Sequence, residues 1–421
     1  MGGQVPVRHA AAISAVFFSM VFSTASGHAQ SSDGRHDIVP GAVSTDADYS
    51  ARMFDRQDDV TNKTVLALRA RQSGALQDYR LYLGGRFLGS VIHESTNTAG
   101  KFPILSRLPP THTLGTSDTY GVVNEASLNA TLTLPWVTAF VQGEYTEVEY
   151  PGQDATQLRK YWIALGDLNQ SPFYLAVGRK TVNFGNFASY APFTHTHSSH
   201  YFWAQSDDPL IELGYVTERT ELALSLLPAH RGLRVVSSPK NNGDYENFAV
   251  NASHRVDLGG DMSLKLGAGY LRGTIYDSTI AHHPPGTGIN RSWNGAYNVN
   301  ATLSGSNFDL MAEFTQTEEV WPATGHSVNA TTVQGRYRAS LLGKPVTYSL
   351  AASRGIQGAK GTAWRKMDQV ILGMEMVLNP HMSIGAEYLF NDGFVPLIMP
   401  TVTAVNGVRS HTVIGGIKLT F

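Results

Sequence analysis

The chain has 421 residues, with 34 acidic and 32 basic side chains and no cysteine. The lack of cysteine excludes disulfide frameworks, thiolate metal sites and cysteine nucleophiles. The formal net charge of −2 gives no reason to expect nucleic acid as a partner. The mean hydropathy of −0.15, with no apolar run of about 18 residues, excludes a polytopic helical membrane protein.

The first 29 residues have the features of a secretory signal peptide. Arg8 provides the positive end, residues 10–22 form the apolar stretch, and residues 27–29 form a small-x-small cleavage site. We therefore predict a cleaved signal peptide over residues 1–29, a mature chain that begins near Gln30, and export from the cytoplasm.

Residues 30–77 differ from the sequence that follows them. Residues 31–58 are polar and without a regular pattern, whereas residues 61–72 predict a short helix with Val65 and Leu68 among its apolar positions. We expect a periplasmic segment that precedes the main fold. It is either a tail with little role or a partial plug inside the fold formed by the rest of the chain.

Residues 78–421 show a period of two, which is typical of half-buried strands. In residues 127–134, for example, apolar side chains occupy the even positions and polar side chains the odd ones. We predict sixteen strands, near 79–92, 120–134, 136–147, 157–168, 173–180, 209–217, 219–228, 246–258, 262–275, 292–305, 307–318, 329–342, 345–355, 367–379, 382–392 and 410–421.

The connections between these segments alternate between short and long. Short ones such as residues 169–172 and 259–261 consist of turn-forming residues. The long ones lie near 93–119, 148–156, 181–208, 229–245, 276–291, 319–328, 356–366 and 393–409. Outer-membrane barrels have short periplasmic turns and long external loops, whereas a soluble sandwich has no reason to separate its connections in this way.

The pattern predicts an all-β fold: a transmembrane antiparallel β-barrel of about 16 strands over residues 78–421, in a bacterial outer membrane. Outer-membrane lipid is then a partner. The last strand ends on Phe421, and a terminal aromatic residue resembles the assembly signal of outer-membrane barrels. We expect Phe421 to be recognised by the barrel-assembly machinery.

Side chains alternate between the two faces of each strand, and the face that carries charges is assigned to the lumen. A charge on the lipid face costs about 2–4 kcal/mol at mid-depth. The assigned residues are Arg80, Arg86, Arg255, Lys265, Arg336, Arg338, Glu125, Glu144, Asp309 and Glu313. Glu212, Glu221, Glu375 and Glu387 fall on the same face. These charges are either a solvated wall or, in part, the determinants of solute preference. The parity of residues 157–168 is ambiguous, so Arg159 and Lys160 stay unassigned.

One long connection has an unusual composition. Residues 183–208, "NFGNFASYAPFTHTHSSHYFWAQSDD", contain seven aromatic residues and three histidines but no lysine or arginine. The candidate constriction residues in it are Phe184, Phe187, Tyr190, Phe193, His195, His197, His200, Tyr201 and Trp203. We expect the connection to fold inward and narrow the channel, as the third loop does in sixteen-stranded porins.

The alternative for this connection is a metal site. H-x-H-x-x-H could bind a metal through its imidazoles, but no acidic or cysteine partner lies at a matching spacing. We therefore assign neither a metal nor a cofactor. The chain contains no GxSxG, HExxH, P-loop or dinucleotide motif, and we predict that it is not an enzyme.

Two stretches, "AVGRKTVNFGNFASYAPFTHT" and "DDPLIELGYVTERTELALS", resemble the LbtU-type siderophore porin family. The matching positions are Gly178, Arg179, Phe184, Gly185, Asn186, Phe187, Asp208, Pro209 and Leu210. Residues 62–87 also resemble that family where its chain enters the barrel. The resemblance implies passive uptake of an iron–siderophore complex through a barrel without a large globular plug domain. The alternative is a general or carbohydrate-selective porin on the same barrel.

Overall fold

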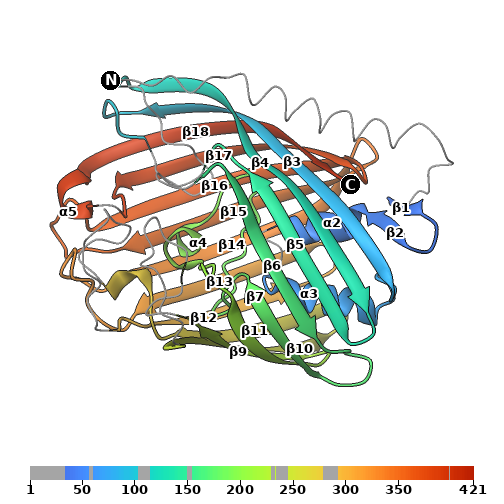
Figure 1. Ribbon diagram of the computed structural model, residues 1–421. Coiled ribbons are helices and arrows are strands. Elements are labelled where there is room, and N and C mark those ends of the chain that lie inside the picture. Colours follow the sequence, from blue (N-terminus) through green and yellow to red (C-terminus); the bar gives the residue numbers. More distant parts are fainter. Residues whose placement is uncertain are drawn as a thin grey trace.

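The computed structural model describes residues 34–55, 60–102, 114–148, 154–228, 233, 245–277, 293–397 and 399–421. Within these residues, consecutive strands β3 to β18 each pair antiparallel with the next, and β18 pairs with β3 to close a barrel of sixteen strands (Figure 1). The predicted fold class, a transmembrane antiparallel β-barrel, is confirmed.

The barrel strands follow the predicted segments closely. They are β3 (Arg80–Thr96), β4 (Ser117–Leu134), β5 (Val137–Tyr145), β6 (Thr156–Leu165), β7 (Phe173–Arg179), β8 (Leu210–Val216), β9 (Thr220–Leu227), β10 (Asn247–Gly259), β11 (Met262–Leu271), β12 (Ala296–Ser304), β13 (Phe308–Thr317), β14 (Asn329–Leu341), β15 (Lys344–Ile356), β16 (Lys366–Asn379), β17 (Met382–Phe394) and β18 (Val405–Thr420). The short 3-10 helix η1 (Ile275–Asp277) and the helix α5 (Pro400–Thr403) lie in long connections.

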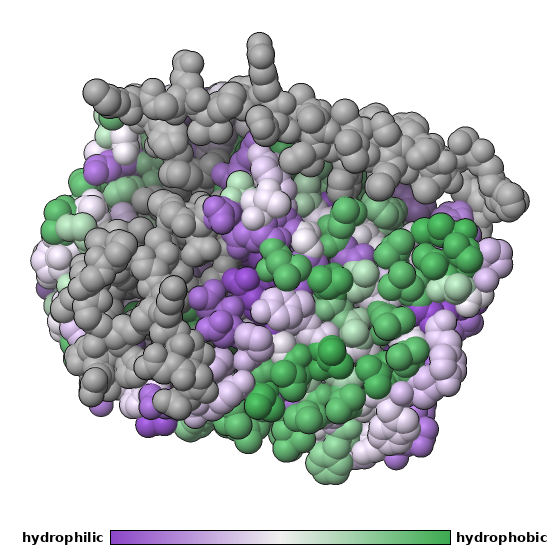
Figure 2. Space-filling view, in the orientation of Figure 1, coloured by the Kyte–Doolittle hydropathy of each residue, from purple (hydrophilic) through white to green (hydrophobic). Residues whose placement is uncertain are grey.

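Side chains alternate between the two faces of the wall. On β7, Leu175 and Val177 point outward and are 38% and 43% exposed, whereas Tyr174 and Ala176 point inward and are buried. Hydrophobic side chains gather over the strands that face the viewer in Figure 2. An apolar exterior on a closed wall, whose backbone groups are paired from strand to strand, suits the hydrocarbon of a bilayer. The protein is located in the bacterial outer membrane.

In β6 and in β4, a β-bulge shifts which side chains point inward. In β6, Lys160 pairs with Gln142 and Leu158 with Gly143, so Arg159 is the extra residue. Arg159 and Lys160 are consequently both buried on the inner face. The extra residue disrupts the period of two, which is why the sequence left these residues unassigned. A second shift in β4 similarly places two consecutive residues, Asn124 and Glu125, inside.

The segment before the barrel is more regular than the sequence predicts. Within residues 34–55, expected to be irregular, β1 (Arg35–Val39) and β2 (Val43–Asp46) form a hairpin that leads into α2 (Ala47–Phe54). Strand β2 pairs parallel with the first residues of β3, beyond the point where β18 ends. The predicted helix over residues 61–72 is present as α3 (Lys63–Gln72).

Helices α2 and α3 lie inside the barrel, at the end where the turns are short (Figure 1). Their apolar side chains pack against inward-facing wall residues of β3 and β5 to β8, among them Tyr82, Phe140 and Trp162. Ser50 of α2 lies directly over Gly84 of β3, where any larger side chain would collide with it. None of the described helices is long and apolar enough to cross a bilayer.

Candidate functional site

The third long connection, residues 180–209 between β7 and β8, is called loop 3 below. It contains the helix α4 (His197–Phe202). Of the nine candidate constriction residues in it, Trp203 is half-buried and the following eight are buried: Phe184, Phe187, Tyr190, Phe193, His195, His197, His200 and Tyr201. Loop 3 therefore packs against the protein along most of its length.

The first part of loop 3 crosses the lumen and is held by inward-facing side chains of the opposite wall. The Glu313 carboxylate on β13 accepts hydrogen bonds from the backbone N–H groups of Asn186 and Phe187, both at 3.0 Å. Gln334 on β14 accepts from the Tyr190 N–H at 2.9 Å and donates to the Ala188 carbonyl at 2.7 Å. These bonds satisfy loop backbone groups that would otherwise be buried without a partner.

The tip of loop 3 reaches the strands where the barrel closes. The Glu387 carboxylate on β17 accepts hydrogen bonds from the N–H groups of Phe193 and Thr194 and from the Thr194 hydroxyl. The Phe193 ring packs among apolar side chains of β3 and β18, including Leu88 and Ile414. Loop 3 thus extends from β7 to the opposite side of the barrel.

The second part of loop 3 returns along β15 and β14. The His197 N–H donates to the Ser353 hydroxyl at 3.2 Å, and the Ser198 and Thr332 hydroxyls lie 2.8 Å apart. The Tyr201 ring lies over Gly355 of β15, where even a Cβ atom would collide with it. This part of loop 3 therefore also follows the inner wall.

We predict that Glu387→Ala releases the tip of loop 3. The change leaves two buried N–H groups without an acceptor, each at a cost of about 1–3 kcal/mol. Single-channel recordings should show a larger and noisier conductance, while the barrel stays folded. Glu375→Ala is the control, because Glu375 is an inward carboxylate bonded to Ser383 and Lys418 and not to loop 3. Equal effects of the two changes would contradict the anchoring role.

The basic residues predicted on β14 form a charged group with an acid and an aromatic ring. Asp309 accepts hydrogen bonds from Arg336, at 2.6 Å, and from Arg338. The Arg336 guanidinium lies 4.4 Å from the centre of the Tyr190 ring of loop 3. This group carries a net positive charge beside loop 3.

A second charged group is buried on the inner faces of β3 to β6. It comprises Arg86, Glu125, Glu144 and the two residues of the bulge, Arg159 and Lys160. Arg159 lies 3.6 Å from Glu144, and the Ser127 hydroxyl donates to Glu125 at 2.9 Å. The sequence predicted three of these charges, and the bulge adds two bases beside them.

Three further predicted lumen charges lie near the end with the short turns. Arg80 lies against the hairpin, where it donates to Asp37 at 2.8 Å and to Ser44 at 2.9 Å. Arg255 is exposed beside a turn, and Lys265 lies 3.8 Å from Glu221. Arg80 and Arg255 are thus at the periplasmic mouth, whereas Lys265 lines a pocket that loop 3 also lines.

The three histidines of loop 3 do not converge. The rings of His197 and His200 both contact the Tyr201 ring, with centroids 5.8 and 5.5 Å apart. Within the described ranges, no three His, Asp or Glu side chains are close enough together to hold a metal ion. Burial lowers the pKa of His197 to about 3 and that of His200 to about 4, so both imidazoles are neutral at physiological pH.

These lowered pKa values predict how loop 3 responds to acid. Unfolded histidine takes up its proton near pH 6.5, so the unfolded loop binds more protons than the folded one between that pH and about pH 4. The stability of loop 3 should therefore fall as the pH drops through this window. Above pH 7 both imidazoles are neutral in the folded and in the unfolded loop, so they should not make the conductance depend on pH. The double variant His197→Asn/His200→Asn, recorded from pH 4 to 8, should lose the acid response. If the double variant keeps the acid response of the unchanged protein, the two histidines are not its cause.

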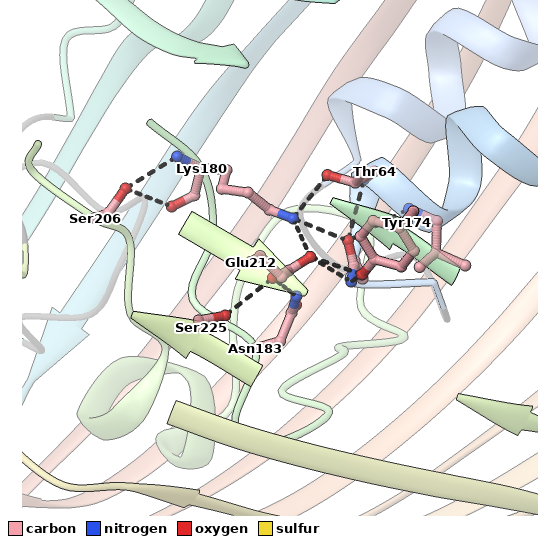
Figure 3. A network of polar contacts seen from close by, with 9 residues as sticks. Thr64, Tyr174, Lys180, Asn183, Ser206, Glu212 and Ser225 are labelled. Carbon is pink, nitrogen blue, oxygen red and sulfur yellow. Dashed lines mark hydrogen bonds and ion pairs between the residues drawn. The ribbon is translucent and has the colours of Figure 1, made fainter. Parts of the chain in front are cut away.

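One buried ionic network was not predicted as a site. Glu212 on β8 and Lys180 of loop 3 form an ion pair of 2.5 Å, with both side chains almost fully buried. Figure 3 shows Lys180 extending toward Glu212 and toward Thr64 of α3. The sequence placed Glu212 on the inner face, but nothing in the pattern indicated that Lys180 and Asn62 meet it.

A polar pocket lies between α3, loop 3 and the inner faces of β9 to β12. Five of its lining residues are asparagines: Asn62, Asn183, Asn186, Asn251 and Asn300. The side-chain oxygens of Asn186 and Asn251 are buried and make no hydrogen bond. Its two charged residues, Lys265 and Glu221, lie beside each other. The pocket is therefore polar with little net charge.

The fold is that of known outer-membrane porins. The anion-selective porin from Comamonas acidovorans aligns with a TM-score of 0.51 and 13% identity, over 81% of this chain and 99% of that chain. OprB of Pseudomonas putida aligns with a TM-score of 0.53 and 12% identity, over 80% and 94%. OmpF of Salmonella typhi, solved with daunomycin, aligns with a TM-score of 0.50 and 13% identity, over 81% and 97%. The sequence matches no protein-family model and no curated protein.

The closed barrel, its apolar exterior and these likenesses define the class: the chain is a bacterial outer-membrane β-barrel with the sixteen-stranded porin fold. At such low identity the likeness concerns the fold alone.

Proposed function

We propose that the protein is a passive outer-membrane porin, without enzymatic activity, whose channel is narrowed by loop 3. The observation that supports this most is the attachment of loop 3 to the far wall through Glu313, Gln334 and Glu387. A loop held at three points across the lumen leaves a reduced path for solutes. The nine candidate constriction residues of loop 3 then act mainly by their bulk rather than by charge.

We propose a ferric siderophore as the solute. This proposal is supported by the resemblance of residues 176–196 and 207–225 to siderophore porins. Among the candidate constriction residues, the half-buried Trp203 has a ring that can stack on the flat face of a solute, whether a sugar ring or a catecholate. Cationic Arg336 and Arg338 beside Tyr190 suit a solute that carries negative charge.

The second candidate is a carbohydrate or general porin, and the asparagine-lined pocket favours it. Carboxamides both donate and accept hydrogen bonds, which suits the hydroxyl groups of a neutral sugar. The absence of net charge in the pocket also suits a neutral solute.

Flux into liposomes distinguishes the two candidates. Liposomes that contain the purified protein should take up a ferric siderophore faster than a neutral sugar of similar mass, and cells with the protein should grow better under iron limitation. Faster sugar uptake with no effect on growth would favour the second candidate. No uptake of either solute would contradict the porin function.

We further propose that Phe421 is the residue that the assembly machinery recognises. Its backbone exchanges two hydrogen bonds with Gly85 of β3, at 3.0 and 3.1 Å, and so lies at the closing pair of strands. The signal peptide over residues 1–29 lies outside the described residues and stays a prediction.

A further inference from the structure

Glu212 lies where three parts of the molecule meet: the wall, loop 3 and the helix α3. Its carboxylate is fully buried and accepts hydrogen bonds from five side chains. They are Lys180 at 2.5 Å, Asn183 at 2.6 Å, Tyr174 at 2.7 Å, Ser225 at 3.0 Å and Asn62 at 3.2 Å. All five donate to it, so the site suits a side chain that only accepts hydrogen bonds, as a carboxylate does.

On the helix side, the network includes the N-terminus of α3. Asn62 caps the helix by accepting from the N–H groups of Thr64 and Val65. The Lys180 ammonium donates to the Thr64 hydroxyl at 2.7 Å and to the Asn62 side-chain oxygen at 3.3 Å. The start of α3 is thus bound to the base of loop 3.

On the loop side, the same lysine closes the base of loop 3. The Lys180 N–H donates to the Ser206 hydroxyl at 3.0 Å, and that hydroxyl donates back to the Lys180 carbonyl at 3.1 Å. A bridge between Thr181 and Gln205 continues this pairing. The two ends of loop 3 are therefore joined at the residue that also holds α3.

We propose that the Lys180–Glu212 pair is a positioning element that holds α2 and α3 in the periplasmic half of the lumen and fixes them to loop 3. The inference rests on the proposed porin function. The helices and loop 3 then form one obstacle, and the width of the channel depends on this pair.

The physical reason is the cost of breaking the pair in a dry site. Replacing one partner leaves the other charge buried without compensation, which is strongly unfavourable. The wall cannot move, because its backbone is bonded on both sides of β8. The helices can move more easily, since they are joined to the barrel by the hairpin and by side chains, including the Arg69–Glu221 ion pair and the bond from Arg71 to the Gly166 carbonyl. Breaking the pair therefore displaces α2 and α3.

The test uses Glu212→Gln, which keeps the shape of the side chain and removes its charge. Single-channel conductance should rise several-fold above that of the unchanged protein. A cysteine introduced as Ala67→Cys reports the position of α3, because Ala67 is fully buried and the chain has no other cysteine. A water-soluble maleimide should label it slowly in the unchanged background and much faster with Glu212→Gln.

Two further variants serve as controls. One tests the network without changing the barrel wall, and the other tests whether breaking an ion pair elsewhere has the same effect. Asn62→Ala removes the bonds of Asn62 to Glu212, Tyr174 and Lys180, leaves the Thr64–Lys180 bond and does not change the wall. It should act in the same direction, with a smaller effect. Asp257→Asn breaks an exposed ion pair with Arg219 near the periplasmic turns, and it should change neither readout.

A disulfide provides the reverse experiment. Ser50→Cys/Gly84→Cys places the two Cβ atoms 3.0 Å apart, closer than the range of about 3.5–4.5 Å in disulfides, so α2 must move away from β3 by about 0.5 Å for the bond to form. The oxidised bond should hold α2 on the wall and cancel the effect of Glu212→Gln, and reduction should restore it. If the unchanged protein conducts but Glu212→Gln and Asn62→Ala alter neither conductance nor labelling, the positioning role is wrong and the porin function stands.

Discussion

Replacing residues 188–200 with a short glycine–serine linker is expected to raise single-channel conductance several-fold and to admit larger solutes. The removed stretch contains the groups that bond to Gln334, Glu387 and Ser353 on the far wall. It also contains Phe193, whose ring packs where the barrel closes. Without these contacts, loop 3 stays bound to the far wall through Glu313 but no longer extends to β14, β15 and β17. Planar-bilayer recordings and liposome uptake of solutes of graded size measure both effects.

The control for this trim is a change of the same kind in another long connection. Residues 359–361, between β15 and β16, are exposed. Replacing them with glycine and serine should leave the conductance unchanged. An unchanged conductance after the trim of loop 3 itself would refute its constriction role, and the histidine cluster would then become the feature to explain.

Arg336→Glu/Arg338→Glu is expected to turn the ion preference of the channel strongly toward cations. Both side chains lie on the inner face and share Asp309 as their partner. The double change converts a net positive group into three adjacent carboxylates, and it removes the cation over the Tyr190 ring. In a narrow, partly desolvated channel, such charges act strongly on permeant ions. Reversal potentials in a salt gradient measure the preference.

The matched control places the same change of charge on the outer face. Arg354 and Arg409 point outward near the external rim and pair with Asp368 and Asp392. Arg354→Glu/Arg409→Glu should leave the reversal potential almost unchanged. If the inner double variant fails to insert into the membrane, or shifts the potential no more than the outer one, the assignment of these arginines to the pore is wrong.

The strands were predictable because the wall requires them to be regular. Each strand has one face in lipid and one in the lumen, so a period of two persists along most of the barrel. The alternation of short and long connections follows from the two different sides of a membrane. The inward and outward positions could not be assigned where a bulge interrupts the period, as at Arg159 in β6.

The N-terminal hairpin and α2 were not predictable by the same reasoning. Strand β1 lacks a buried face, and β2 is held by pairing with β3, far along the chain. The hairpin also accepts hydrogen bonds from Arg80, which lies outside this segment of the sequence. The hairpin depends on partners that the local sequence does not show. Helix α2 has a local signal that was missed, its cap at Asp46, just as α3 has its cap at Asn62.

The composition of loop 3 indicated a packed loop, but its partners were hidden. Glu313 and Glu387, which hold loop 3, lie at inward-facing positions of their strands, as do acids that only line the wall. The sequence pattern therefore does not distinguish the two kinds of acid. A usable signal was present in glycines at inward positions. Gly269 lies against the Phe184 carbonyl and Gly355 against the Tyr201 ring, at two points where loop 3 follows the wall. Inward glycines therefore mark the path of an inserted segment.

Single-channel recording of the unchanged, purified protein in a planar bilayer tests the central claim most directly. A passive porin narrowed by loop 3 should insert in discrete steps, each adding a small conductance that is linear in voltage. The trim of residues 188–200 should enlarge each step. A protein that is folded and inserted but produces no conductance steps, before and after the trim, would contradict the account.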